Sequence, residues 1–331
     1  MNPRELILIN LKRHDLEYPT KVREALIHAD DALRKKDIVF GRQIISEIVF
    51  MDNKASRLNS TQELQLIVVL LTEFFTRDDP TRLGLFFSIF EVGKNSRKFI
   101  LIKFIIISIA LQNGPALNAV GTYLMDPSMK EIRITADLNR LLISEITYYS
   151  NISLDKLKSL PSLSPLFTNS LCLIFAETYK DDMLPTKLVG ELITEFMALS
   201  PFIYIFNIPS HVEVGTFLLG AFFRWTILSE LYEETPSLSK LHLKMLECLS
   251  SVDIKSPSKP IVYTKFLEII IDQIQKASKV KDPERIQKSL EKFAQLIQIS
   301  KNFLYGNIPL FMERLKSLPK NPLMELILRL S

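Results

Sequence analysis

Helical spacing of apolar residues is the feature that most constrains how this chain folds. Between residues 260 and 277, apolar side chains recur three or four positions apart, at Val262, Phe266, Ile269, Ile270 and Ile274. The spacing returns between 283 and 300, at Ile286, Leu290, Phe293 and Ile297, and it gives each helix one apolar stripe. Only Lys281-Asp282-Pro283 separates the two segments. We therefore predict an antiparallel pair of helices here.

Segments with this spacing occur along the whole chain, and the breaks between them are short. The chain has only nine glycines, and its 17 prolines fall mostly between apolar blocks, which is typical of helices joined by turns rather than of a sheet. The sequence predicts an all-α protein with about fifteen helices. Their expected ranges are 20–36, 40–52, 60–77, 82–92, 97–112, 115–125, 135–149, 163–179, 186–199, 211–232, 238–250, 260–279, 283–300, 307–317 and 322–330.

The length of 331 residues exceeds what one hydrophobic core usually supports. No fixed period of about 30 to 47 residues repeats. We predict an irregular α-solenoid of stacked helical hairpins, similar to HEAT repeats, although such helices can also pack as a globule. Serines and prolines interrupt the periodicity between 150 and 165. This seam divides an N-terminal helical lobe, 1–155, from a C-terminal helical lobe, 156–331, and we expect the two to continue as one solenoid.

Two local patterns predict packing roles. Ser60-Thr61-Gln62-Glu63 has the spacing of a capping box, with the Ser60 hydroxyl accepting from the Glu63 amide. A buried helix is expected to follow, with core residues Leu64, Leu66, Val68, Leu70, Leu71, Phe74 and Phe75. Trp225, the single tryptophan, stands within the apolar block 217–228. We interpret it as a core anchor rather than a base-stacking residue or a ligand cage.

Charge and hydropathy argue against nucleic-acid and membrane partners. The net charge is +4, from 41 basic and 37 acidic residues, and the two signs are interleaved along the chain. Basic clusters at 34–36, 94–98 and 316–320 adjoin predicted helix ends, where solvated cations are expected and phosphate contact is the alternative. The apolar stretch 99–111 contains Lys103 and is shorter than the about 20 residues of a membrane span. We predict a buried helix there.

The sequence offers no pattern for catalysis, cofactor binding or metal binding. Glycine-rich phosphate loops, GxSxG and HExxH pairs are absent. Cys172 and Cys248 are too far apart for a CxxC motif, so buried thiols in a reducing, intracellular compartment are expected. The apolar run at 6–9 is too short for a signal peptide. Acidic doublets are interpreted as capping or solvated charges rather than acid/base pairs, and they are Asp30-Asp31, Asp78-Asp79, Asp181-Asp182 and Glu233-Glu234.

The last predicted helix, 321–330, is the candidate partner-binding element. Its apolar residues cover more than one face, and its only charged residues are Glu325 and Arg329. One apolar face can pack on the preceding helix, but the remaining face needs a second cover, from this chain or from a partner. The candidate partner-binding residues are Leu323, Leu326, Ile327 and Leu330.

One block of the sequence resembles a known family. The residues Arg57-Leu58-Asn59-Ser60-Thr61-Gln62-Glu63-Leu64-Gln65-Leu66 resemble the RLNSxQELQL signature of the Integrator complex subunit 15 family. Further similarity follows in the same order along nearly the whole chain. It lies at Ser164-Pro165-Leu166-Phe167, Met183-Leu184-Pro185, Arg224-Trp225, 239–243, 290–297 and 318–323.

The resemblance implies a nuclear, non-enzymatic, α-helical scaffold subunit. The Integrator complex that it implies cleaves nascent transcripts of RNA polymerase II, attenuates and terminates transcription, and processes the 3′ ends of snRNA. The resemblance also implies protein partners, a bridge to the arm module of subunits 10, 13 and 14, and no cofactor. The alternative from the residues alone is an RNA-binding helical-repeat protein, which requires a regular repeat with base-reading side chains or a segregated basic stripe. Neither pattern is visible.

Overall fold

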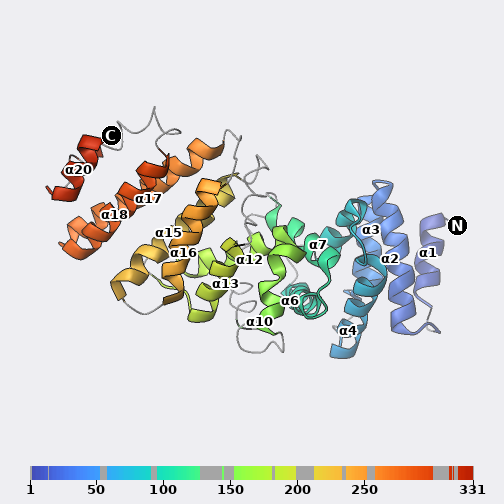
Figure 1. Cartoon of the computed structure of the whole chain (residues 1–331). Helices are drawn as coiled ribbons and strands as arrows, with labels where there is room; N and C mark the ends of the chain where they lie inside the picture. Colours follow the sequence, from blue (N-terminus) through green and yellow to red (C-terminus); the bar gives the residue numbers. More distant parts are fainter. Residues whose placement is uncertain are drawn as a thin grey trace. The chain divides into compact units, whose positions relative to one another are not determined.

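Helices form every regular element that the computed structural model describes (Figure 1). The described residues are 2–13, 15–52, 58–90, 95–126, 144, 153–180, 183–198, 212–232, 236–251, 258–300, 313–314, 316 and 320–330. The all-α prediction is confirmed. The chain divides into two compact units, Met1–Ser170 and Leu171–Ser331, and a continuous solenoid through both stays a prediction. Among the described residues no helix is both long enough and apolar enough to cross a membrane.

The first unit contains long helices interrupted by short π and 3-10 segments. Its π segments are η1 (Ile45–Val49) and η2 (Leu70–Phe74), which extend α3 and α4, and its 3-10 turn is η3 (Pro80–Arg82). Its α-helices are α1 (Pro3–Leu11), α2 (Tyr18–Arg34), α3 (Ile38–Ile44), α4 (Ser60–Val69), α5 (Leu83–Ile89), α6 (Asn95–Ala110), α7 (Gly114–Met125), α10 (Leu154–Lys158), α11 (Leu160–Leu163) and the start of α12 (Pro165–Thr178).

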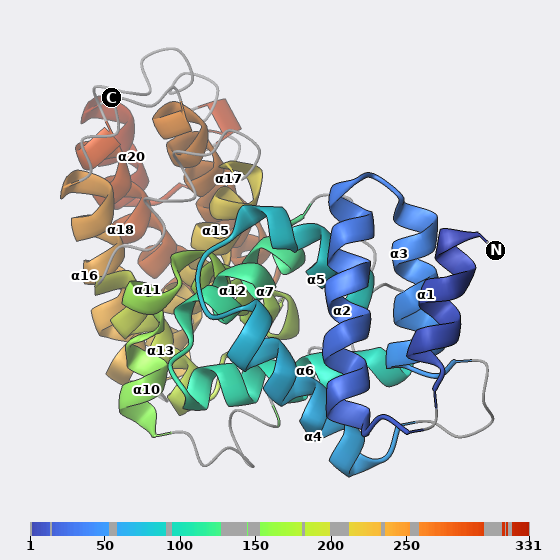
Figure 2. The ribbon, with the colours of Figure 1, turned by 90° about the vertical axis from the view of Figure 1, so that its right-hand side faces the viewer.

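The N-terminal helix α1 lies outside the predicted set of helices. Its apolar run at 6–9 is continuous and hides the helical period, but Asn2 caps the helix and Pro3 stands in its first turn. Helix α2 packs against both α1 and α3 (Figure 2). Two ion pairs attach α1 to this group of helices. Arg4 pairs with Asp37, the N-cap of α3, at 2.6 Å, and Lys12 pairs with Glu47 of η1 at 2.7 Å.

Aromatic side chains form the centre of the first unit, between η2, α5, α6 and α7. Phe86 packs edge-to-face on Phe75 and Phe104, with ring centroids 5.3 Å and 5.7 Å apart. The hydroxyl of Tyr123 donates to the Phe90 carbonyl at 2.6 Å. Most of α6 is buried in this core, as predicted for the stretch 99–111, although Phe99 and Leu111 near its two ends are exposed.

Residues up to 170 belong to the first unit because α10, α11 and the start of α12 pack on α6 and α7. The hydroxyl of Ser159 donates to Gln112 Oε1 at 2.6 Å. A Cβ atom at Gly121 of α7 would lie only 2.5 Å from the backbone nitrogen of Phe167 in α12. The two backbones therefore touch at Gly121. The unit boundary falls within α12, later than the lobe boundary at 155 that the sequence predicts, and the lobes as domains stay a prediction.

The second unit is built around α15, which is apolar on all sides. Helices α16, α17 and α18 pack against α15, and α13 packs on α16. The predicted pair of helices appears as α17 and α18, which lie side by side in Figure 1. Beyond the end of α12, the helices of this unit are α13 (Lys187–Ala198), α15 (Val212–Tyr232), α16 (Pro236–Ser251), α17 (Ser258–Lys279), α18 (Pro283–Ser300) and α20 (Pro322–Leu330). The predicted helices at 135–149 and 307–317 lie mostly outside the described residues.

Trp225 is a core anchor of the second unit, as predicted. Its side chain is fully buried in α15 and contacts the rings of Phe222 and Tyr179. Its indole nitrogen donates to the Tyr179 carbonyl at 2.9 Å, and Arg224 donates to the same oxygen at 3.1 Å. The two donors satisfy a carbonyl just beyond the last residue of α12, where helix hydrogen bonds end.

Candidate interaction surfaces

Cysteine and histidine side chains often take part in catalysis or metal binding, and their burial and contacts decide whether they can do so here. Cys172 is fully buried, and this burial raises the pKa of its thiol well above the ordinary range. His242 is buried against Phe223, and its Nε2 lies 2.7 Å from Gln295 Oε1. His28 is exposed. Within the described ranges, no group of three or more His, Cys, Asp or Glu side chains is arranged to hold a metal ion. His14, His211 and the Cys248 side chain lie outside the described residues.

The start of α4 corrects the predicted cap. Asn59, not Ser60, is the N-cap: its side-chain oxygen accepts from the Gln62 amide at 2.9 Å, and the Gln62 side chain accepts from the Asn59 amide at 3.0 Å. Asn and Ser are both good N-caps. The sequence therefore contains two capping boxes shifted by one residue, and the helix uses the earlier one. Glu63 instead forms an ion pair of 2.5 Å with Lys103.

The outer face of α4 was also predicted wrongly as core. Leu64 is 52% exposed and Val68 is 49% exposed, whereas Leu66, Ile67 and Val69 are buried. Residues four apart share a helix face, and α4 packs on α2 and α6, which leaves the Leu64 and Val68 face open. The block that resembles the family signature therefore mixes core and surface residues.

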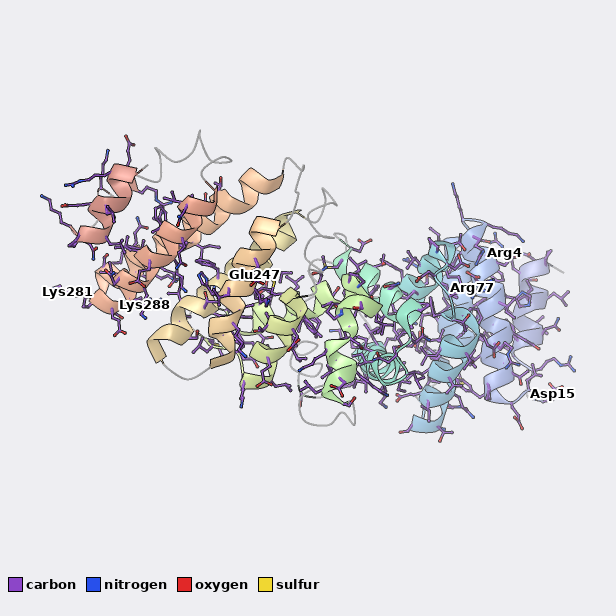
Figure 3. The ribbon with its side chains drawn as sticks, viewed as in Figure 1. Arg4, Asp15, Arg77, Glu247, Lys281 and Lys288 are labelled. Atoms are coloured by element: carbon purple, nitrogen blue, oxygen red, sulfur yellow. The ribbon has the colours of Figure 1, made fainter. Side chains whose placement is uncertain are left out.

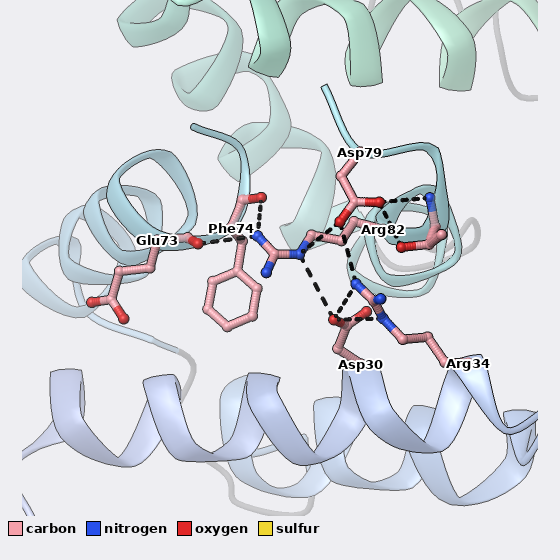
Figure 4. A network of polar contacts seen from close by, with 7 residues as sticks. Asp30, Arg34, Glu73, Phe74, Asp79 and Arg82 are labelled. Carbon is pink, nitrogen blue, oxygen red and sulfur yellow. Dashed lines mark hydrogen bonds and ion pairs between the residues drawn. The ribbon is translucent and has the colours of Figure 1, made fainter. Parts of the chain in front are cut away.

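Acidic residues in the first unit are held by arginines rather than arranged as an acid/base pair (Figure 4). Asp30, which was interpreted as a capping or solvated charge, is buried in α2 and pairs with Arg34 at 3.0 Å. Arg34 also reaches Asp79 at 3.4 Å. Asp79 does cap a helix, because it accepts from Thr81, and the hydrogen bond from the Thr81 hydroxyl lowers the Asp79 pKa.

Arg82 completes this network from η3. It lies 3.8 Å from Asp30 and 3.6 Å from Asp79, donates to the carbonyls of Glu73 and Phe74 at 3.1 Å and 2.6 Å, and stacks over the Phe74 ring (Figure 4). These carbonyls end the π segment η2, where backbone acceptors lack helical partners. The network therefore fixes η2 against α2. The doublets Asp181-Asp182 and Glu233-Glu234 lie outside the described residues.

Arg97 contradicts the interpretation of the 94–98 cluster as solvated cations. Its side chain is 1% exposed and forms an ion pair of 2.9 Å with Asp52. It donates to the carbonyls of Ser88 and Ile89 near the end of α5, and it stacks 4.1 Å from the Phe50 ring centroid. Asp52 is 45 positions away in sequence. No local sequence pattern predicts this pair, because only the fold brings Arg97 and Asp52 together.

The last helix, α20, packs on α18 and leaves part of its apolar side open. Asn321 caps it by accepting from the Leu323 amide at 2.9 Å, and the Asn321 side chain donates to Gln287 of α18 at 3.5 Å. Of the predicted partner-binding residues, Leu326 is 51% exposed and Leu323 is half-buried. The side chains of Ile327 and Leu330 lie outside the described residues. Partner contact through this face stays a prediction.

The fold and these surroundings define a helical protein in which the described buried polar groups cap and join helices, and in which exposed helix faces are the candidate sites. Known proteins of one family are similar to this chain over most of its length. The profile of the Integrator complex subunit 15 family matches residues 8–320. The chain therefore belongs to the Integrator complex subunit 15 family.

Named relatives span nearly the same length. Integrator complex subunit 15 of Drosophila melanogaster is 27% identical over 363 aligned positions, which cover 96% of each chain. The Mus musculus and Homo sapiens proteins of the same name are each 23% identical, covering 86% of this chain and 80% of theirs. The resemblance drawn from the sequence blocks is thus confirmed at the level of the family.

Proposed function

We propose that this chain is a subunit of the Integrator complex and acts as a scaffold that bridges other subunits. Family membership over residues 8–320 is the observation that carries this proposal. The proposed setting is the nucleus, in cleavage of RNA polymerase II transcripts, transcription attenuation and termination, and snRNA 3′-end processing. The proposed partners are Integrator subunits 10, 13 and 14.

We propose further that the chain contributes no catalytic group of its own. The residues that suggest chemistry in the sequence have packing roles in the described part of the chain. Asp30 and Asp79 pair with arginines, Cys172 is buried, and His242 is bonded to Gln295. General acid/base or nucleophilic work requires such groups to face a substrate. Their engagement supports a structural subunit.

The partner-binding face that we propose is the open side of α20, with Leu323, Leu326, Ile327 and Leu330. Support comes from Leu326, whose side chain is 51% exposed although α20 packs on α18. An apolar side chain at the centre of an interface contributes most once water is excluded around it. A partner helix that covers Leu326 would provide that exclusion.

The test compares two exposed leucines of the second unit. Leu326→Asp is expected to abolish co-purification of other Integrator subunits with the tagged full chain, and Leu243→Asp on α16 is the matched control, because Leu243 is 60% exposed. Circular dichroism and gel filtration must show that both variants stay folded. Equal recovery of subunits with both variants would refute the α20 face. Absence of Integrator subunits from the wild-type sample would refute the scaffold proposal itself.

A further inference from the structure

The outer end of the α17 and α18 pair is a rigid turn. The Asp282 amide donates to the Ala277 carbonyl at 2.9 Å, and the Lys281 amide donates to the Ser278 carbonyl at 3.3 Å. This is the Schellman pattern that closes a helix, and Lys281 takes the left-handed conformation it requires, with φ 55°. The Asp282 side chain then caps α18 by accepting from the Arg285 amide at 3.0 Å. Side chains on this turn are therefore presented from a fixed backbone.

Three contacts bring a later part of the chain to the same end of the pair. Arg314 forms an ion pair of 3.0 Å with Asp272 and donates to Gln275 at 3.4 Å, so it lies beside the last turns of α17. Asn321 donates to Gln287 near the start of α18. Arg314 and Asn321 therefore lie near the end of the pair at which α17 meets α18, and Lys316 and Lys320 are within two positions of them in sequence.

Five exposed lysines gather on these segments, and they are Lys276, Lys279, Lys281, Lys316 and Lys320. Figure 3 shows Lys281 and the half-buried Lys288 at this end of the second unit. None of the five lysines forms an ion pair or side-chain hydrogen bond with any residue in the described part of the chain. Some lysines elsewhere are paired, since Lys12, Lys35 and Lys103 each contact a carboxylate within 2.7 Å.

Carboxylates at this end do not neutralise the lysines. Asp272 is paired with Arg314, and Asp282 caps α18. Glu284, Glu313 and Glu325 are exposed, and they are fewer than the five lysines. Gathered charges of one sign raise the local potential and attract ligands of the opposite sign. An anionic ligand is therefore the kind of partner that this surface favours.

The composition of the surface favours a protein ligand over a nucleic acid. Single-stranded nucleic acid is usually held by aromatic side chains that stack on bases and by planar arginine groups. The described residues of α17, α18, α20 and 313–321 expose no aromatic side chain, and Arg314 is engaged by Asp272. The exposed apolar side chain of the turn is Val280, which is 69% exposed between Lys279 and Lys281. Lysines that surround an exposed valine can bind a peptide segment in which acidic residues flank an aliphatic side chain.

We propose that the lysine cluster at the α17–α18 turn, formed by Lys276, Lys279, Lys281, Lys316 and Lys320, docks an acidic segment of a partner protein. This docking would be one of the protein contacts of the proposed scaffold, so its biological role rests on that proposed function. Peptide binding is measured with the purified chain alone. A negative result would therefore refute the docking site without refuting the scaffold function, which co-purification tests.

The experiment measures fluorescence anisotropy of two labelled probes with the purified full chain. One probe is a peptide of five glutamates, one leucine and five further glutamates. The other is a uridine oligonucleotide with the same number of negative charges. The triple variant Lys279→Gln, Lys281→Gln and Lys320→Gln is expected to bind the peptide about tenfold more weakly than wild type. Added salt should also weaken wild-type binding, because exposed charges are screened.

The control is the triple variant Lys36→Gln, Lys187→Gln and Lys240→Gln, which removes the same charge from exposed positions elsewhere. Lys36 is also left-handed, with φ 62°, and so matches Lys281. This control is expected to bind the peptide like wild type. Equal weakening by both triple variants, or no wild-type binding at low salt, would overturn the proposal. Tighter binding of the oligonucleotide than of the peptide through the same lysines would replace it with a nucleic-acid surface.

Discussion

Among the glycines that the structure describes, Gly121 approaches the backbone of another helix most closely. A Cβ atom there would meet the Phe167 nitrogen at 2.5 Å and the Leu166 carbonyl carbon at 2.8 Å, both of which are backbone atoms. Gly121→Ala is expected to destabilise the first unit by about 1–3 kcal/mol through overpacking. In the control Gly84→Ala, no atom lies within 4 Å of the new methyl group, and a gain of about 0.4–1 kcal/mol is expected. Urea denaturation followed by circular dichroism measures both, and equal stability of the two variants would contradict the close approach.

Trp225 combines a large buried ring with a hydrogen bond, and two substitutions separate them. Trp225→Ala leaves a cavity and is expected to cost about 3–5 kcal/mol. Trp225→Phe keeps much of the ring but loses the hydrogen bond to the Tyr179 carbonyl. Because Arg224 still donates to that carbonyl, a cost nearer 1 kcal/mol is expected. Thermal melting of each purified variant provides the comparison. A melting temperature unchanged by Trp225→Ala, together with lost partner binding, would make Trp225 an interface residue.

At the scale of the element, the α4 cap distinguishes two neighbouring residues. Asn59→Ala removes both the acceptor for the Gln62 amide and the reciprocal box, and it is expected to cost about 0.5–2 kcal/mol. Ser60→Ala changes an exposed residue inside the first turn and is expected to cost less than about 0.5 kcal/mol. Denaturation midpoints of the two variants test this order. The reverse order would show that Ser60 is the cap in solution.

Helix α1 is attached partly through a pH-sensitive pair. The hydrogen bond from Lys12, followed by that from Gln43, lowers the pKa of Glu47. A lowered carboxyl pKa in the folded state stabilises the fold above the ordinary glutamate value, about 4.3, and that contribution is lost as the pH falls through the lowered value. Lys12→Ala is therefore expected to cost about 0.2–1 kcal/mol at pH 7 and less in acid below pH 4. A cost that does not change with pH would contradict a role for the Lys12 and Glu47 charges.

Elements with long, regular apolar stripes could be predicted from the sequence, and shorter ones could not. The α17–α18 pair follows from apolar residues at helical spacing and a short break. Helices α10 and α11 are short and lie in the stretch 150–165, where serines and prolines hide any period. Ile67 and Leu64 have similar hydropathy, yet only Ile67 is buried, because burial depends on which neighbours pack against each face of α4.

At the scale of the whole molecule, the sequence predicts the fold class and the family but not the long-range polar contacts. Arg97 depends on Asp52, and Arg82 depends on Asp30, so each needs a partner brought near by the fold. The lysine cluster at the α17–α18 turn was not predicted as one surface for the same reason. Only Lys316 and Lys320 belonged to a predicted basic cluster, and their approach to α17 and α18 depends on Arg314 and Asn321.

If this chain is a structural subunit of the Integrator complex, as we propose, the other subunits must be bound to it in the cell. The full chain, tagged at its own locus, is purified from nuclei at physiological salt, and the co-purifying proteins are quantified by mass spectrometry. We expect Integrator subunits, with 10, 13 and 14 among them, in amounts equal to the tagged chain. Recovery of the tagged chain alone, or with RNA or other proteins in place of Integrator subunits, would contradict the proposal.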